Sequence, residues 1–265
     1  MRFKKILSAT AAFAATVIPA YSQVDFLTSG SCDGSGAGTI QGHPRAGGRM
    51  QLVTGVPYSA RQSTESIQTL ADGTHITRQV PPDTMTWRDS SGRVRIEMDP
   101  SSGKDGPCRS VLIEVEDPVA GHLYVIDPIN KIAHRLQVVP MPVPARSAGL
   151  APDARPTRPG GPTMTSQPLG KRMMLGTEAE GTTRTMTYPV GSRNDRPLTI
   201  TDEIWTAPGI GLVYSKNSNP DGTVTTTMLN DLSTAEPDPT LFRIPAGYEI
   251  VDEAGPFTIS IPAHN

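Results

Sequence analysis

The stretch from Val115 to Leu136, VEDPVAGHLYVIDPINKIAHRL, holds two histidines, three acids and a tyrosine within twenty-two residues. Side chains of these types bind metal ions or transfer protons when they meet in space. Taken as two strands joined at DPIN, where Asn130 tolerates a left-handed backbone, the stretch places Asp127 opposite Lys131. In that register His122 and His134 are diagonal neighbours on one face, roughly 7 to 8 Å apart at the backbone. The sequence therefore permits a two-histidine site.

A structural hairpin explains the same stretch with fewer requirements. A metal site needs three or four ligands, whereas the predicted face otherwise carries Ile126, Ile132 and Leu136. Asp117 and Asp127 each precede a proline, a position at which an acid side chain commonly sets a turn. We therefore expect a plain hairpin without metal or cofactor, and we retain the two histidines only as candidates for a metal-dependent enzyme.

Other catalytic patterns are missing or weak. The chain contains neither HExxH nor GxSxG. Glu114 and Glu116 share one face of a predicted strand, as do Glu97 and Asp99, and paired carboxylates can hydrolyse glycosidic bonds. On an exposed strand face such pairs are ordinary solubilising residues, and this is the environment we expect for them. The sequence therefore favours a protein that is not an enzyme.

The first twenty-two residues have the three-part plan of a secretory signal peptide. Basic residues open it, an apolar, alanine-rich run follows, and Ala20 and Ser22 are the small residues expected before a cleavage site. We predict cleavage after Ser22 and a periplasmic or secreted protein. No later run is apolar for the length of about 20 residues that a membrane-spanning helix needs.

Cysteine content and charge agree with export. The two cysteines, Cys32 and Cys108, would enter an oxidising compartment, and neither has a CxxC partner. We therefore predict one disulfide bond between them. The formal net charge is −2 and the charges are interspersed, which gives no support to nucleic acid as a partner.

A proline-rich segment at 139–168 divides the rest of the chain into halves at 52–138 and 169–252. Proline removes a ladder donor, so this segment predicts a long exposed loop or linker. Each half alone offers four or five strands, and one sheet shared by both is the simpler arrangement. The predicted regions are a signal peptide at 1–22, a flexible Gly/Ser-rich leader at 23–51, a single β domain at 52–252 and a C-terminal tail at 253–265.

Within the halves, polar and apolar residues alternate between turn signals. TMTWRD and VRIEMD, for example, flank the turn at 90–92. Such alternation is typical of strands with one buried and one solvated face. The chain also contains 25 Gly and 26 Pro, which favours turns and strands over helices. We predict a mainly β fold, namely a curved antiparallel sheet or open half-barrel with a long Pro-rich loop and few or short helices.

Five stretches carry a resemblance to a known group: LADGTHITRQV, DPVAGHLYVIDPINKIAHRL, AEGTTRTMTYPVG, EIWTAPGIGLVYSK and AEPDPTLFRIPAGYEI. Over about Pro57 to Ile250 the chain resembles uncharacterised exported proteins of soil bacteria. These are distantly similar to the periplasmic half-barrels that include the lipoprotein carriers LolA and LolB and the regulator RseB. The resemblance implies a sheet curled around an apolar concave face. The sequence departs from the carriers in lacking amphipathic helices and a lipid-anchor signal, and no catalytic residue is transferred.

Three hypotheses for function follow. The first is a non-catalytic binder or carrier of an apolar ligand or lipoprotein in the cell envelope. The second is an envelope scaffold or interaction protein without a ligand cavity, and the third is the metal-dependent enzyme that uses His122 and His134. The tentative lining of the concave face comprises Met85, Trp87, Ile96, Met98, Trp205 and Val213.

Overall fold

The computed structural model describes residues 24–29, 38–45, 49–80, 82–99, 111–142, 161–191 and 195–261. Within these ranges no helix is long and apolar enough to span a membrane. The helical element is the 3-10 turn η1 (Pro239–Phe242). The strands are β1 (Val24–Ser29), β2 (Gly38–Pro44), β3 (Arg49–Leu52), β4 (Tyr58–Thr69), β5 (His75–Gln79), β6 (Asp83–Arg88), β7 (Val94–Asp99), β8 (Leu112–Asp117), β9 (His122–Asp127), β10 (Ile132–Gln137), β11 (Val139–Pro142), β12 (Thr163–Met174), β13 (Thr177–Tyr188), β14 (Leu198–Ala207), β15 (Gly211–Ser218), β16 (Thr223–Ser233), β17 (Glu249–Asp252) and β18 (Phe257–Ile261).

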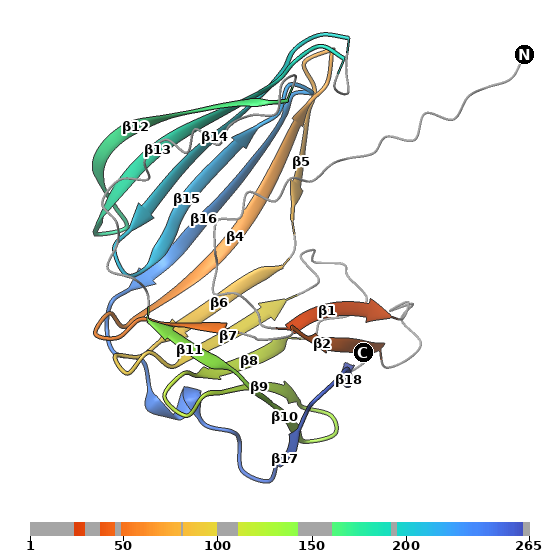
Figure 1. The fold of residues 1–265 in the computed structure, drawn as a ribbon, viewed down its shortest axis with the longest axis vertical. Helices are drawn as coiled ribbons and strands as arrows, with labels where there is room; N and C mark the ends of the chain where they lie inside the picture. Colours follow the sequence, from red (N-terminus) through yellow and green to blue (C-terminus); the bar gives the residue numbers. More distant parts are fainter. Residues whose placement is uncertain are drawn as a thin grey trace, which may run out of the picture.

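One large sheet contains thirteen of these strands and draws on both halves of the chain (Figure 1). Its order is β12-β13-β14-β15-β16-β4-β6-β7-β8-β9-β10-β17, and β5 pairs with β4 beside this path. The two halves of the chain meet in this sheet at the antiparallel ladder of β16 with β4. The final pair, β10 with β17, is parallel. The prediction of a mainly β fold with a curved sheet is confirmed, and the two halves share that sheet.

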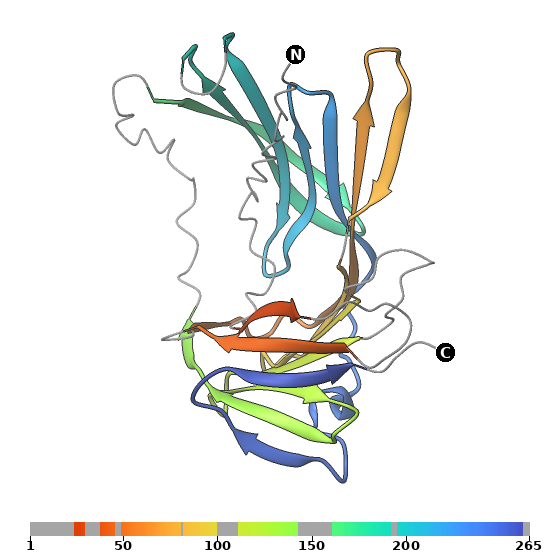
Figure 2. The same cartoon turned by 90° about the vertical axis from the view of Figure 1, so that its right-hand side faces the viewer.

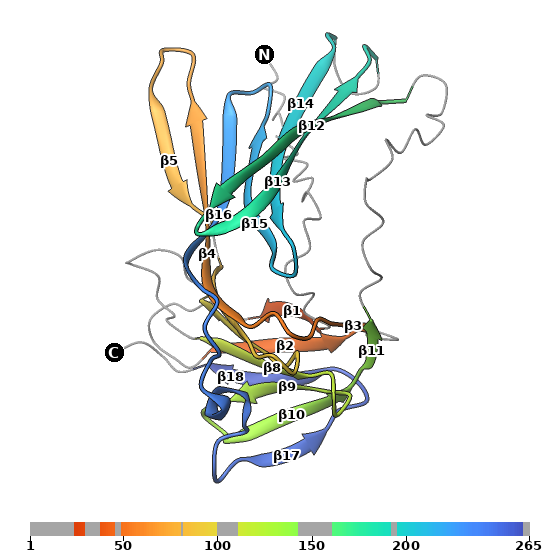
Figure 3. The same ribbon diagram turned by 90° about the vertical axis from the view of Figure 1, so that its left-hand side faces the viewer.

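Two smaller sheets accompany the large one. They are the three-stranded sheet β1-β2-β18, called the small sheet below, and the parallel pair β11-β3. The small sheet lies against the lower half of the large sheet, which consists of β6 to β10 and β17 (Figures 2 and 3). The upper half of the large sheet consists of β12 to β16 with β5 and most of β4. The lower half is therefore a sandwich.

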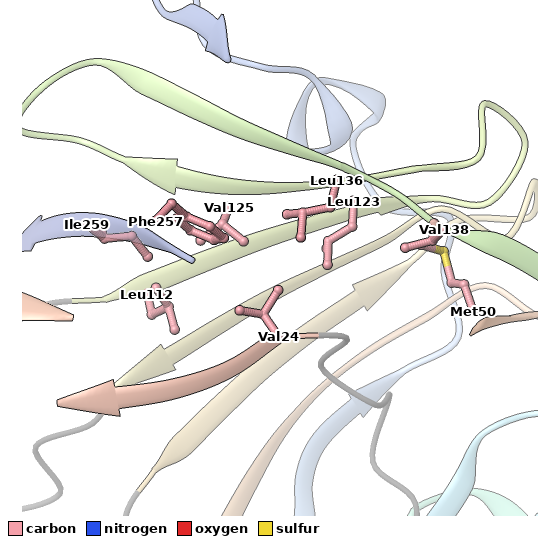
Figure 4. Packing of buried hydrophobic residues seen from close by; sticks show 9 residues of the cluster. All are labelled: Val24, Met50, Leu112, Leu123, Val125, Leu136, Val138, Phe257 and Ile259. Atoms are coloured by element: carbon pink, nitrogen blue, oxygen red, sulfur yellow. The ribbon is translucent and has the colours of Figure 1, made fainter. Parts of the chain in front are cut away.

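The core of the sandwich is one cluster of buried apolar side chains (Figure 4). Leu123 and Val125 of β9 are fully buried, and they face Val24 of β1 and Phe257 of β18 across the two layers. We call the face of the large sheet that points into this core the inner face. The cluster comprises Val24, Met50, Leu112, Leu123, Val125, Leu136, Val138, Phe257 and Ile259.

The opposite, outer face of the lower half also has a covering segment. Arg95 of β7 donates a hydrogen bond of 3.1 Å to the carbonyl of Leu241, and the guanidinium of Arg93 lies 5.2 Å from the ring centre of Phe242. These contacts hold η1 on β7 and β8. Outer-face residues such as Val115 and Ile126 are therefore only 1% and 3% exposed. The lower half is buried on both faces, as a central layer should be.

The hairpin of β9 and β10 differs from the predicted register by one residue. Asp127 pairs with Ile132, His122 with Gln137, and His134 with Val125. The loop holds four residues rather than three because Lys131, not Asn130, takes the left-handed backbone, with φ of 53°. A shift of one residue moves a side chain to the other face of a sheet.

Both aspartates of this region do set turns, as the sequence predicts. Asp117 Oδ1 accepts hydrogen bonds from the backbone N–H groups of Val119 and Ala120. Asp127 Oδ1 accepts the equivalent pair from Ile129 and Asn130. Asp127 is 1% exposed, and its Oδ2 also accepts 2.9 Å hydrogen bonds from the Asn130 amide and from the backbone N–H of Ser260 in β18. The second turn is therefore bonded directly to the small sheet.

Three regional predictions need correction. The expected flexible leader at 23–51 contains β1, β2 and β3, and the expected tail at 253–265 contains β18. The ends of the expected linker at 139–168 belong to β11 and β12. These strands escaped prediction because they are short or proline-containing and gain their order from tertiary pairing. The predicted signal peptide and the predicted disulfide between Cys32 and Cys108 lie outside the described residues.

Replacing Asp127 by Ala should destabilise the fold by about 2 to 4 kcal/mol, because it leaves buried donors of the turn and of β18 unsatisfied. The matched control is Asp117→Ala, which removes the same turn bonds without a link to the small sheet. We expect about 1 kcal/mol there. Urea denaturation measures both, and equal losses in the two variants would show that the bond to β18 adds no stability.

Candidate functional site

The inner face continues from the covered lower half into the upper half. In the lower half, cross-strand pairing leads from Leu123 to Glu116, Val94, Arg88 and Tyr58. Paired residues of adjacent strands share a face. Along β4, Tyr58 and Gln62 share a face because every second residue of a strand points to the same side. The inner face of the sandwich therefore extends across the junction between the halves.

In the upper half this face carries apolar residues on three adjacent strands. Gln62 pairs with Leu229 of β16, and the same face then follows Thr227, Ser215 and Ile204 to β14. Alternation along β14 adds Ile200 and Leu198, and their partners on β13 and β12 complete the group. We call this group the apolar row. It comprises Met164, Met186, Tyr188, Leu198, Ile200 and Ile204.

The apolar row borders a polar part of the same face. Thr64 of β4 and Thr227 of β16 share a hydrogen bond of 2.9 Å between their hydroxyls. Nearer the row, the Asn217 amide donates a 2.5 Å hydrogen bond to Asp202, which pairs across the strands with Arg184. The inner face of the upper half is therefore amphipathic. On β12 to β14 the polar row of Ser166, Arg184 and Asp202 lies between Ile204 and the other apolar residues, and hydroxyls and amides lie on β15, β16 and β4.

Within the described ranges, no second layer covers the apolar row as one covers the lower half. Among the described elements, β12 to β16 pack closely only with their neighbours in the same sheet. The side chains of Met186, Leu198, Ile200 and Ile204 are accordingly only half-buried, and Met164 is 44% exposed. Apolar side chains that are aligned on one face but not fully buried are typical of a surface that receives an apolar partner.

The structure does not bring the six tentative lining residues together. Ile96 is buried in the inner face of the sandwich, and Met98 packs against its core cluster. Met85 and Trp87 lie on the outer face, since they pair with Glu97 and Arg95. Val213 is 1% exposed at an irregularity of the β14–β15 ladder, and Trp205 lies on the outer face. The sequence signal for the apolar row was instead the alternation in TMTS, TMTY and LTITDEI.

Trp205 has a structural role. Its ring covers Gly181 of β13, where an added Cβ would lie 2.7 Å from the ring. The guanidinium of Arg172 lies 3.9 Å from the ring centre, and the indole N–H donates a 2.6 Å hydrogen bond to Glu203. Trp205 is thus 5% exposed although it lies on the outer face. An aromatic ring over a strand glycine fixes register between neighbouring strands.

Substitution of Gly181 by Ala should destabilise the protein by about 1 to 3 kcal/mol, because the new methyl group displaces the Trp205 ring. Gly255→Ala is the control, since an added Cβ there meets nothing within 4 Å. Thermal unfolding of both variants, followed by tryptophan fluorescence, checks the difference. A Gly181→Ala protein as stable as wild type would show that the ring moves at no cost.

The structure also contains a buried pair of carboxyl groups that the sequence analysis assigned to an exposed face. Glu114 is fully buried and Glu116 is 4% exposed, so that assignment is wrong. Both lie on the inner face of β8, where they pair with Ile96 and Val94 of β7. Burial, together with the charge of Glu114, raises the pKa of Glu116 to about 8. The pair escaped prediction because a strand that is covered on both faces leaves no solvated side for its acids.

The two candidate histidines are separated by the register. His122 lies on the outer face, and its ring centre is 6.0 Å from that of Tyr124. His134 is 5% exposed on the inner face, where its Nδ1 lies 2.7 Å from Glu253 and its ring stacks on Phe257. Among the residues described, no group of three or more His, Cys, Asp or Glu is placed to hold a metal ion. The predicted two-histidine geometry is therefore wrong.

Ionisation of Glu116 makes stability depend on pH. The unfolded chain releases this proton near its ordinary value of 4.5, whereas the folded protein holds it up to about pH 8. The contribution of Glu116 is therefore complete below about pH 4.5 and declines as the pH rises to 8, by about 1.4 kcal/mol per pH unit for one group. Glu116→Gln should flatten this slope in urea denaturation measured from pH 5 to 8.

Glu249→Gln is the control for that experiment, because Glu249 is exposed on β17. It should keep the slope of the wild type. The interpretation fails if Glu116→Gln and wild type lose stability in parallel over this range.

Comparison with known proteins gives distant structural similarities. No family model matches the chain, and no curated protein matches it. A LolA superfamily protein of Nitrosomonas europaea covers 71% of this chain and 90% of its own, with 9% identity and a TM-score of 0.26. The lipoprotein LppX of Mycobacterium tuberculosis covers 69% of this chain and 90% of its own, with 10% identity and a TM-score of 0.28.

A DUF1329 family protein of Desulfovibrio piger matches over 72% of this chain and 91% of its own, with 12% identity and a TM-score of 0.24. The distant similarity to the LolA superfamily that the sequence suggested is thus confirmed. Likeness at this level says nothing about what this protein binds. The inner face itself has to carry any functional argument.

Proposed function

We propose that this protein is a non-catalytic binder of an apolar or acyl-chain ligand, and that the apolar row is its binding face. One observation carries the proposal. The face that forms the core of the lower half continues into the upper half, where the described residues include no layer to cover it.

The energetics of the apolar row support an apolar ligand. Its members are half-buried or exposed, so a ligand laid along them removes further apolar area from water. Each methylene of an acyl chain that becomes buried contributes about 0.8 kcal/mol. Met164, Met186 and Ile200 are cross-strand partners on three adjacent strands, which gives a contact row perpendicular to the strands. Two methionines in this row supply unbranched, adaptable side chains suited to a chain of variable shape.

The surroundings of the row indicate where a polar end of the ligand would lie. The neighbouring part of the inner face offers the hydroxyls of Thr64 and Thr227 and the polar groups of Asp202 and Asn217. A ligand with an apolar chain and a polar end therefore matches both parts. Binding in the cell envelope follows from the predicted signal peptide at 1–22, and this location remains a prediction.

The alternation of β14 provides a matched pair of variants. Ile200 lies in the apolar row, and Thr201 lies on the outer face of the same strand. Titration with a fluorescent long-chain fatty acid should give a dissociation constant at least tenfold weaker for Ile200→Lys, because a lysine among apolar contacts costs the bound state more than about 1.4 kcal/mol. Thr201→Lys should bind as the wild type does.

Two further measurements make the test decisive. Thermal unfolding must show that both lysine variants are folded, and Met186→Lys with its outer neighbour Thr185→Lys should repeat the result on β13. Native mass spectrometry of the wild type purified from a bacterial periplasm should detect a copurifying lipid. A wild type that binds no acyl probe, or equal weakening in the inner and outer variants, would contradict the proposal.

A further inference from the structure

The buried carboxyl group of Glu116 lies on the inner face of β8, beside the core that joins the large sheet to the small sheet. It pairs with Leu123 of β9, which is fully buried in the cluster that joins the large sheet to Val24 and Phe257 of the small sheet. The strand that carries Glu116 is held on both sides by the ladders of β7 and β9. The small sheet forms no ladder with the large one, and Figure 2 shows it as a separate layer. The small sheet is therefore the layer that can move without breaking the large sheet.

Polar contacts join the small sheet to the hairpin of β9 and β10. Ser260 of β18 donates its backbone N–H to Asp127, and its hydroxyl lies 2.9 Å from the Asn130 amide. His134 and Glu253 are joined at the start of the chain segment that leads to β18. The core cluster, which also joins the small sheet to the large sheet, consists of apolar side chains. The attachment of the small sheet is therefore sensitive to charge that appears within the core.

The position of Glu116 disfavours its ionised form. Its Oε1 is buried and accepts no hydrogen bond within the described part of the chain, and a buried carboxylate needs such bonds to offset its lost hydration. Glu114 stands two residues away on the same face of the same strand. A negative charge on both groups would place like charges side by side in an apolar surrounding.

The other titratable groups on the inner face of the lower half lie on β4, β6, β9 and β10. Tyr58 of β4 and Arg88 of β6 follow it along the cross-strand row. Arg88 donates to the carbonyls of Val56 and Gly209 and lies over the Tyr58 ring at 4.6 Å, so its described bonds go elsewhere. On β10, His134 is bonded to Glu253. The inner core also presents apolar residues from β1, β3, β7, β9 and β18, namely Val24, Met50, Val94, Ile96, Leu123, Val125, Phe257 and Ile259. On β9 the same face ends in Asp127, which accepts hydrogen bonds from its own turn and from Ser260.

We propose that the small sheet is a proton-dependent cover of the lower half: it stays packed on the inner face while Glu116 is protonated and separates when Glu116 ionises. Separation lets water reach the new carboxylate and relieves its repulsion with Glu114. It also exposes the inner face of β8 to β10, which is continuous with the apolar row through the cross-strand pairing. The proposal does not depend on what the apolar row binds.

Hydrogen exchange followed by mass spectrometry tests this on the full mature chain. The opening equilibrium of amides in β2 and β18 should rise by up to about tenfold per pH unit between pH 5 and 8 and level off above pH 8. Amides of β15 and β16 in the same molecule serve as the internal reference and should show a smaller rise. Intrinsic exchange rates, measured on the unfolded chain at each pH, are divided out.

Three variants decide the cause. Glu116→Gln should keep the small sheet closed at every pH, and Glu116→Leu, which matches its neighbour Leu123, should do the same if the glutamine variant folds poorly. Asp127→Ala should increase opening at all pH values without changing the pH slope, because it removes the bond to Ser260 and leaves Glu116 in place. Equal pH slopes in β18 and β15, or a slope that survives in both Glu116 variants, would overturn the proposal.

Discussion

Continuity of side-chain facing across one sheet is the constraint on which the rest of this structure depends. Successive residues of a strand point to opposite faces, and paired residues of neighbouring strands share a face. Once Leu123 and Val125 are fixed in the core, the facing of Ile200 and Met186, seven and eight strands away along the sheet, is fixed as well. The inner face of the lower half and that of the upper half are therefore one continuous face, whether or not a second layer covers it.

The two halves use this common face differently. In the lower half the small sheet and η1 cover both sides, and the central strands include fully buried residues such as Leu123, Val125 and Ala133. In the upper half the edge strand β12 is exposed along nearly its whole length, and β13 and β14 are half-buried. Among the described residues, burial is thus concentrated in the sandwich, and the inner face of the upper half is less buried.

Burying two acids in the sandwich is at odds with maximal stability. Leu or Val at Glu116 would fit the apolar surroundings that Leu123 and Val94 provide, and a carboxyl group there costs desolvation. Such a group makes the core responsive to pH in a range where exposed carboxyl groups no longer titrate, because burial raises its pKa to about 8. Structural features that reduce stability without helping the fold are commonly connected with function.

The sequence by itself determined the elements: alternation and turn residues indicate the strands, and Asp117 and Asp127 set their turns as expected. Local chemistry suffices there because facing within one strand and bonding within one turn involve neighbouring residues. Tertiary structure decided the register, the layers and the burial. Lys131 rather than Asn130 took the left-handed position and so separated His122 from His134, while the assembly of the sandwich left Glu116 buried. Both outcomes depend on residues distant in sequence, whose pairing no local pattern encodes.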